Sequence, residues 1–86
     1  LRRLIPTATR STTMIEVRAE RRTLSKHRSL LHAMASARTW SRHTNTQPRI
    51  AVPEPRFSAM LASGEIYETA GGEFIDSSRQ WVIERA

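Results

Sequence analysis

Apolar and polar residues repeat with the period of an α-helix through the first half of the chain. Residues 14–42 contain no proline or glycine, and the good helix formers alanine, leucine and arginine are frequent. At 100° per residue, the apolar side chains fall within an arc of about 140° and the basic side chains within an opposite arc of about 160°. This pattern predicts an amphipathic helix with one basic face.

The start of this helix is indicated by Thr13 and Glu16, which match the Ser/Thr-x-x-Glu capping box. We therefore predict one long helix within residues 13–42. A helix of about 26 residues is about 39 Å long. Because that length is large for a chain of 86 residues, we expect the helix to lie along another molecule rather than within a compact globule.

Helical periodicity ends in a polar stretch that leads to three closely spaced prolines. Pro48, Pro53 and Pro55 lie within eight residues, and each proline favours an extended conformation in the residue before it. We predict that residues 43–54 form an extended connector. Its apolar segment, residues 50–52, is expected to dock on a partner.

The C-terminal segment, residues 55–86, predicts a short helix followed by strands. A helix is expected from Arg56 to Ser63, with Gly64 ending it. Alternating residues on both sides of the turn at residues 70–72 predict a hairpin, and residues 80–84 a third strand. The predicted fold is therefore mainly α-helical with a small β element, non-compact and dependent on partners.

The composition indicates a small core and excludes several kinds of site. The chain has 86 residues, only five of them aromatic, and no cysteine. Chains this short bury a modest share of their surface, so a partner is the expected source of stability. Disulfides, iron–sulfur clusters and cysteine-ligated zinc are excluded. No apolar run is long enough for a transmembrane helix.

Charge is distributed unequally between the two halves of the chain. Residues 1–49 carry eleven cations against two glutamates, a net charge of +9, whereas residues 50–86 carry −3. A basic half attracts phosphate or an acidic protein surface, although a GC-rich genome would also favour arginine codons. The candidate residues for binding nucleic acid or an acidic surface are Arg2, Arg3, Arg10, Arg18, Arg21, Arg22, Lys26 and Arg28. The alternative is a basic helix face that only contacts solvent.

Large apolar residues are expected to contact neighbouring proteins. Tyrosine and tryptophan in particular are enriched at protein interfaces. The candidate interface residues are Leu24, Leu31, Met34, Phe57, Met60, Leu61, Tyr67, Phe74 and Trp81. The alternative is that those in the C-terminal segment form a small core of their own.

No arrangement of residues indicates catalysis, a metal or a cofactor. His27 and His32 are five positions apart, which does not place them on one helix face as a zinc pair requires. His27 falls on the apolar arc and is interpreted as a packed histidine. Nucleophile-elbow and phosphate-loop motifs are absent. We therefore predict a non-catalytic protein without a cofactor.

The first residues, LRRLIPTATRSTT, are rich in arginine and hydroxyl side chains and contain no acidic residue. In this composition they resemble a mitochondrial targeting presequence, with Arg10 near the position of a processing site. The resemblance implies a basic tail over residues 1–12 and a location in the mitochondrial matrix or on the matrix face of the inner membrane. The alternative is an unstructured basic tail of a bacterial or cytosolic protein.

These observations favour a structural subunit of a large mitochondrial assembly that has several protein partners. The basic half favours a small mitochondrial ribosomal protein that contacts ribosomal RNA and neighbouring proteins. The acidic half keeps a second hypothesis open, an accessory subunit of a respiratory-chain complex or ATP synthase without RNA contact. In either case the isolated chain is not expected to be a stable monomer.

Overall fold

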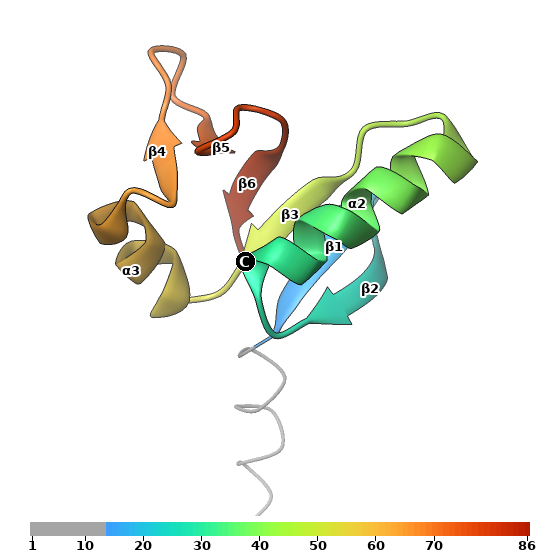
Figure 1. Cartoon of the computed structure of the whole chain (residues 1–86), viewed down its shortest axis with the longest axis horizontal. Helices are drawn as coiled ribbons and strands as arrows, with labels where there is room; N and C mark the ends of the chain where they lie inside the picture. The colour runs from blue at the N-terminus through green and yellow to red at the C-terminus, as the bar shows by residue number, and fades with distance from the viewer. Residues whose placement is uncertain (1–13) are drawn as a thin grey trace, which may run out of the picture.

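The structure is a computed structural model that describes residues 14–86. This part of the chain forms six strands and two helices (Figure 1). In chain order the elements are β1 (Ile15–Ala19), β2 (Arg22–His27), α2 (Leu30–Thr44), β3 (Arg49–Val52), α3 (Arg56–Ser63), β4 (Ile66–Glu68), β5 (Phe74–Asp76) and β6 (Val82–Arg85).

All six strands belong to one mixed sheet with the order β2-β1-β3-β6-β5-β4. β3 and β6 pair in parallel, and the other neighbours pair antiparallel. The connection from β3 to β6 contains α3, β4 and β5, so the C-terminal strand returns to the middle of the sheet (Figure 1). The sheet thus joins residues from both ends of the described chain.

The prediction of a long helix is wrong in its first half, because β1 and β2 form an antiparallel hairpin. In β1 the apolar Ile15 and Val17 are buried and alternate with Glu16 and Arg18, the period of a half-buried strand. Glu16 belongs to this strand and accepts a hydrogen bond from the Thr23 hydroxyl at 2.9 Å, so it caps no helix. The capping-box partner, Thr13, lies outside the described residues.

Only the second half of the predicted helix is helical, as the 15-residue α2. Ser29 caps its N-terminus, where the side-chain oxygen accepts a hydrogen bond from the His32 amide at 3.2 Å. Asn45 ends the helix in the left-handed conformation (φ 57°), which asparagine tolerates better than most residues. The buried residues Leu30, Ala33 and Ala37 face the sheet.

The predicted extended connector is a central strand of the sheet rather than a segment that docks on a partner. In β3, Ile50, Ala51 and Val52 are all fully buried, as is typical of a strand with neighbours on both sides. Pro48 precedes the strand and Pro53 follows it, where a missing amide donor removes no ladder hydrogen bond. The apolar run is therefore covered by the chain's own core.

The predictions for the C-terminal segment agree with the structure in their main elements. The short helix α3 has the expected bounds and ends at Gly64 with φ 85°. β4 and β5 form the expected hairpin, and β6 is the third strand. This meander continues into the main sheet through the pairing of β6 with β3, so it is not a separate β element.

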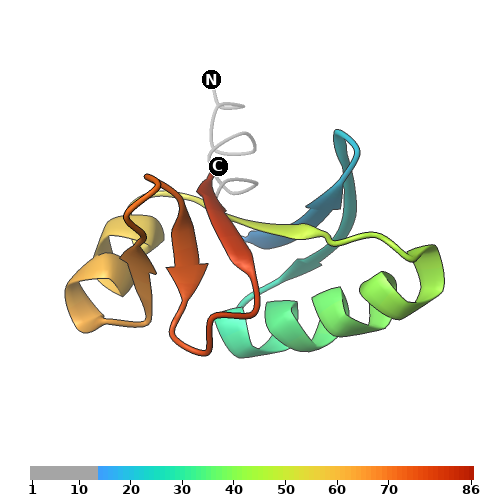
Figure 2. The ribbon, with the colours of Figure 1, turned by 90° about the horizontal axis from the view of Figure 1, so that it is seen from above.

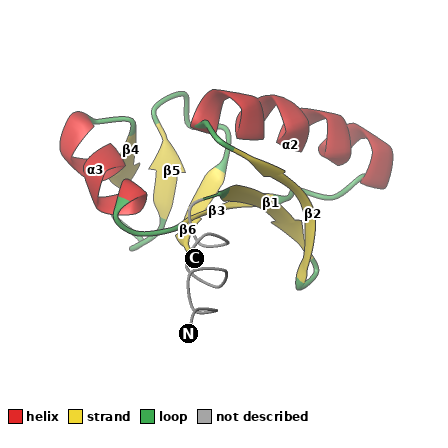
Figure 3. Cartoon of the chain, turned by 90° about the horizontal axis from the view of Figure 1, so that it is seen from below, coloured by secondary structure: helices red, strands yellow, loops and turns green. Residues whose placement is uncertain are grey.

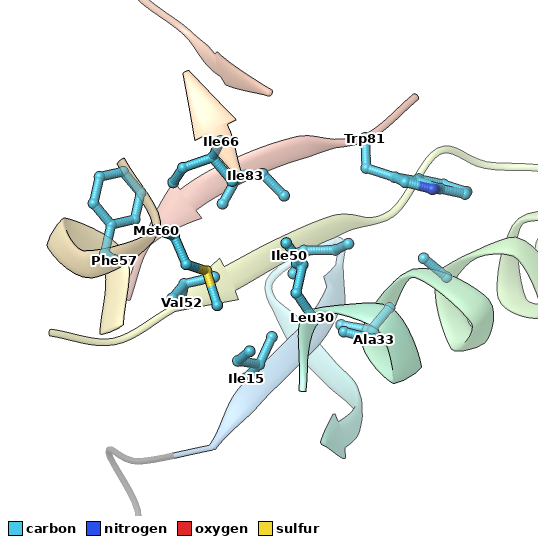
Figure 4. Close-up of a cluster of buried hydrophobic side chains, with 12 residues drawn as sticks. Ile15, Leu30, Ala33, Ile50, Val52, Phe57, Met60, Ile66, Trp81 and Ile83 are labelled. Carbon is cyan, nitrogen blue, oxygen red and sulfur yellow. The ribbon is translucent and has the colours of Figure 1, made fainter. Parts of the chain in front are cut away.

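A single hydrophobic core connects the two helices with the sheet (Figure 4). Leu30 and Ala33 of α2 face Ile50 of β3, while Phe57 of α3 lies near the opposite end of the core (Figure 4). The rings of Phe57 and Phe74 contact edge to face, with their centroids 4.9 Å apart. The fold is compact and has balanced helix and strand content, so the prediction of a mainly helical, non-compact fold is wrong.

One face of the sheet carries this core, and the other face carries no helix among the described residues (Figure 3). The uncovered face has charged residues at the β1 end, among them Glu16, Arg18 and Arg49, and the half-buried Tyr67 and Ile75 toward the β4 end. Within residues 14–86, neither helix has the length and hydropathy needed to cross a membrane.

The charge difference seen along the sequence becomes a difference between the two ends of the molecule. Within the described residues, positions 14–49 carry eight cations and two carboxylates, a net charge of +6, and positions 50–86 carry −3. β1, β2 and α2 lie together at one end of the sheet, whereas α3, β4 and β5 lie at the other (Figure 1). One end is therefore basic and the other acidic.

Candidate anion-binding surface

The β1–β2 hairpin gathers five cations that the sequence singled out. Four of them are exposed: Arg21, Arg22, Lys26 and Arg28. The fifth, Arg18, is half-buried on β1. Among the described residues, none of the five forms an ion pair or a side-chain hydrogen bond. We call these five residues the basic hairpin surface.

The turn of the hairpin places two of these cations at its tip. Glu20 and Arg21 both have positive φ angles, 51° and 70°, as the central residues of a two-residue type I′ turn do. Arg22 then begins β2. Figure 2 shows the hairpin projecting at the end of the sheet opposite α3. The tip is therefore accessible from several directions.

A cleft next to the hairpin adds residues that the sequence reasoning missed. It has a volume of about 470 Å³, and its lining includes Arg18, Arg21, Gln47 and Arg49. Arg49 lies at the start of β3, directly opposite Arg18 in the sheet register. Because this proximity depends on the pairing of β1 with β3, no local sequence signal could have placed Arg49 in the site.

The remaining predicted cations, Arg2, Arg3 and Arg10, lie outside the described residues. The tail at residues 1–12 that resembles a presequence likewise lies outside the structure's description. Of the predicted cations, the structure therefore describes only those of the hairpin, to which the cleft adds Arg49.

The structure places most of the predicted interface residues in or against the chain's own core. Phe57, Met60 and Trp81 are buried core residues. Leu24, Met34, Leu61 and Phe74 are partly buried and pack on that core. Tyr67 is half-buried on the uncovered sheet face. Of the nine candidates, Leu31 alone is a largely exposed apolar side chain, with 70% of its surface accessible.

A short chain of hydrogen bonds between β2 and α2 involves His27. Its Nε2 atom lies 2.8 Å from the Ser25 Oγ, which is 2.7 Å from the Ser36 Oγ. Burial, together with the nearby charge of His32, lowers the pKa of His27 below its usual value of 6.5. No carboxylate of the described residues hydrogen-bonds to the imidazole, so the pair lacks the third group that orients a catalytic histidine. The hydrogen bonds of His27, Ser25 and Ser36 are better explained as part of the packing between β2 and α2.

Among residues 14–86, Asp76 is the most buried charged residue, with 1% of its surface exposed. Its carboxylate accepts hydrogen bonds from the Ser78 hydroxyl and from the backbone amides of Ser78, Gln80 and Trp81, the last at 2.7 Å. Burial alone would raise the pKa of Asp76, but these hydrogen bonds outweigh burial and hold the pKa below its ordinary value of 3.8. Both carboxylate oxygens accept hydrogen bonds from the β5–β6 turn, so Asp76 has a structural role.

Among residues 14–86, no three histidine, aspartate or glutamate side chains come together in a way that could hold a metal ion. Comparison of the chain with protein-family models, with curated proteins and with solved structures finds no match.

Proposed function

We propose that this protein is a non-catalytic subunit that binds the phosphate backbone of RNA through its basic hairpin surface. The observation that carries this proposal is that five cations gather on one hairpin beside two carboxylates, Glu16 and Glu20, and none of the five forms an ion pair with the described residues. Exposed ion pairs contribute little to stability, and exposed arginine and lysine side chains make most contacts to nucleic-acid phosphates. Thirteen of the fourteen cations in the chain are arginine, whose planar fork suits phosphate oxygens.

The proposed setting is a large mitochondrial assembly, in the first place a mitochondrial ribosome. The composition of residues 1–13 supports the mitochondrial part of this proposal. The acidic end of the molecule supports the assembly part, because a net charge of −3 over residues 50–86 disfavours RNA contact and suits a basic protein neighbour.

A binding assay with the full chain and a labelled single-stranded RNA 12-mer tests the RNA contact. The logarithm of the association constant should fall linearly with the logarithm of salt concentration, with a slope of about −0.7 for each phosphate contacted. Arg22→Gln and Lys26→Gln should each reduce affinity and flatten this slope. Arg79→Gln removes the same charge from the acidic end and serves as the matched control. Equal effects of all three substitutions would contradict a binding role for the hairpin.

The acidic end also favours a second candidate, an accessory subunit of a respiratory-chain complex or ATP synthase that makes no RNA contact. Nuclease treatment of the native particle distinguishes the two. Release of the chain together with RNA fragments supports the ribosomal proposal. If the chain stays in a particle that contains no RNA, the accessory-subunit proposal is correct instead.

A further inference from the structure

The cleft beside the hairpin brings arginines from three different segments together. Arg18 comes from β1, Arg21 from the β1–β2 turn and Arg49 from the start of β3. With a volume of about 470 Å³, the cleft can hold a group larger than a carboxylate. The cations therefore face a shared space rather than separate parts of the surface.

The sheet register brings two of these arginines unusually close. Arg18 and Arg49 are directly paired across β1 and β3, so their side chains leave the same face of the sheet. Residues paired in this way have Cβ atoms about 5 Å apart, and like charges at such positions are unfavourable. A bound anion between the two guanidinium groups would remove this repulsion.

Acidic residues of the cleft neutralise only part of its charge. Glu84 approaches Arg49, with 3.7 Å between Oε1 and Nη1, which is long for a salt bridge, and two-thirds of the Arg49 side chain is exposed. Glu20 lies in the turn and forms no ion pair with the described residues. Three cations against two carboxylates leave a net charge of +1, which matches one phosphodiester group.

We propose that this cleft is a specific binding site for one phosphate group of the RNA backbone, held by Arg18, Arg21 and Arg49. This inference rests on the proposed RNA-binding function and adds a defined anchor point to it. Several arginine forks that converge from different strands suit a phosphate, which offers oxygens in several directions. The oxygens of a carboxylate lie in one plane, whereas those of a phosphodiester are arranged as a tetrahedron around the phosphorus and can meet donors from several directions.

Arginine-to-lysine substitutions separate a specific site from general attraction, because they keep the charge and remove the fork. Arg18→Lys and Arg49→Lys should each weaken binding of the single-stranded RNA 12-mer by about tenfold, with an unchanged salt slope. Arg22→Lys, on the exposed hairpin edge, should bind within a factor of two of the wild type. Equal affinities of all three variants and the wild type would overturn the proposed site. Thermal melts of each variant show that it is folded, and Arg49, being exposed at a strand end, tolerates replacement even if Arg18 does not.

A titration with inorganic phosphate, followed by amide NMR shifts of the full chain, tests the cleft without RNA. Saturable shifts should be centred on Ala19, Thr46 and Gln47, which line the cleft, and they should disappear in Arg49→Gln. Acetate at the same ionic strength should cause no such shifts. Equal shifts with acetate would mean that the site takes carboxylates, as on an acidic peptide, and would overturn the phosphate assignment.

The two readouts also separate failure of the cleft from failure of the proposed function. If Arg22→Gln and Lys26→Gln weaken RNA binding while the cleft variants do not, the hairpin binds RNA and the cleft inference is wrong. If the wild-type chain does not bind RNA but phosphate shifts the cleft amides, the RNA function is wrong and the anion site remains.

Discussion

Replacing Glu20 and Arg21 by asparagine and glycine should stabilise the protein, although the same change would destabilise a helix. Both residues have positive φ angles, 51° and 70°. For a residue with a Cβ atom, the left-handed conformation costs about 1–2 kcal/mol, whereas asparagine tolerates it and glycine adopts it without strain. Asn-Gly is also the preferred pair for a type I′ turn.

The expected gain follows from two opposing terms. Relief of strain at Arg21 contributes about 1–2 kcal/mol, and the greater freedom of glycine in the unfolded chain subtracts about 0.5–1 kcal/mol. Asparagine at position 20 adds a few tenths of a kcal/mol. We expect a net stabilisation of about 1 kcal/mol, which raises Tm by about 4–8 °C for a domain of this size.

Urea denaturation and thermal unfolding followed by circular dichroism measure this change. The matched control is Arg22→Gly, which removes an arginine one position later, inside β2, and should cost about 0.5–1 kcal/mol. If residues 14–28 formed part of a long helix, glycine at either position would destabilise it by about 1 kcal/mol. A loss of stability from the Asn-Gly pair would therefore refute the hairpin.

Three further predictions concern the core and its titrating groups. Asp76→Asn should lower the free energy of unfolding by about 2 kcal/mol, because it replaces a buried charged acceptor. The folded pKa of Asp76 lies below 3.8, so the stability that this carboxylate contributes is present above that pH and is lost as the pH falls. Urea titrations at several pH values should find this pH dependence reduced in the variant. The folded pKa of His27 lies below 6.5, so the stability that the neutral imidazole contributes should be present above pH 6.5 and be lost as the pH falls below it. His27→Gln should flatten that dependence in urea melts at several pH values. Trp81→Phe should change the free energy of unfolding by less than about 1 kcal/mol. The smaller ring loses volume in the core, but the change also removes an indole N–H that is buried without a hydrogen-bond partner among the described residues. In the same assay, Phe57→Ala should cost about 3–5 kcal/mol.

The C-terminal half could be predicted from sequence because its signals are local. Pro55 and Gly64 delimit α3, and glycines 71 and 72 lie in the turn between β4 and β5. Each of these residues has a backbone preference that acts within a few positions. Their effect does not depend on what the rest of the chain does.

The first half could not be predicted in the same way because its turn contains no glycine, asparagine or proline. Glu20 and Arg21 are good helix formers, yet they occupy the left-handed conformation. Alternation in β1 covers only five residues, and over so short a segment periods of 2 and 3.6 are hard to separate. Burial of Ile15 and Val17 against the core decides the outcome. This burial depends on β3, whose Ile50 pairs with Val17 from 33 positions further along the chain.

The candidate site was predictable in its residue types but not in its geometry. Arg18, Arg21 and Arg22 were expected to lie on one face of a helix, and they lie instead on a hairpin. Basic residues in a contiguous stretch remain close together in either structure, so composition indicates a basic surface even when the secondary structure is wrong. The pairing of Arg18 with Arg49 arises only from the sheet topology. A cleft formed by distant segments is therefore the part of a site that sequence reasoning is least able to anticipate.

Because the chain has a compact core of its own, the basic hairpin surface is not needed for folding. Were the chain dependent on partners for its fold, cations such as Arg22 and Lys26 would contribute to stability through those partners. With the core formed by the chain's own residues, exposed cations that form no ion pair with the described residues add little to stability. Their substitution should change the free energy of unfolding by less than about 0.5 kcal/mol. At the same time, each cation kept at the basic end adds to electrostatic repulsion with its neighbours. Cations that contribute little to folding and repel one another are best explained by an anionic partner. Substituting them should therefore lower the affinity for RNA while leaving the free energy of unfolding nearly unchanged.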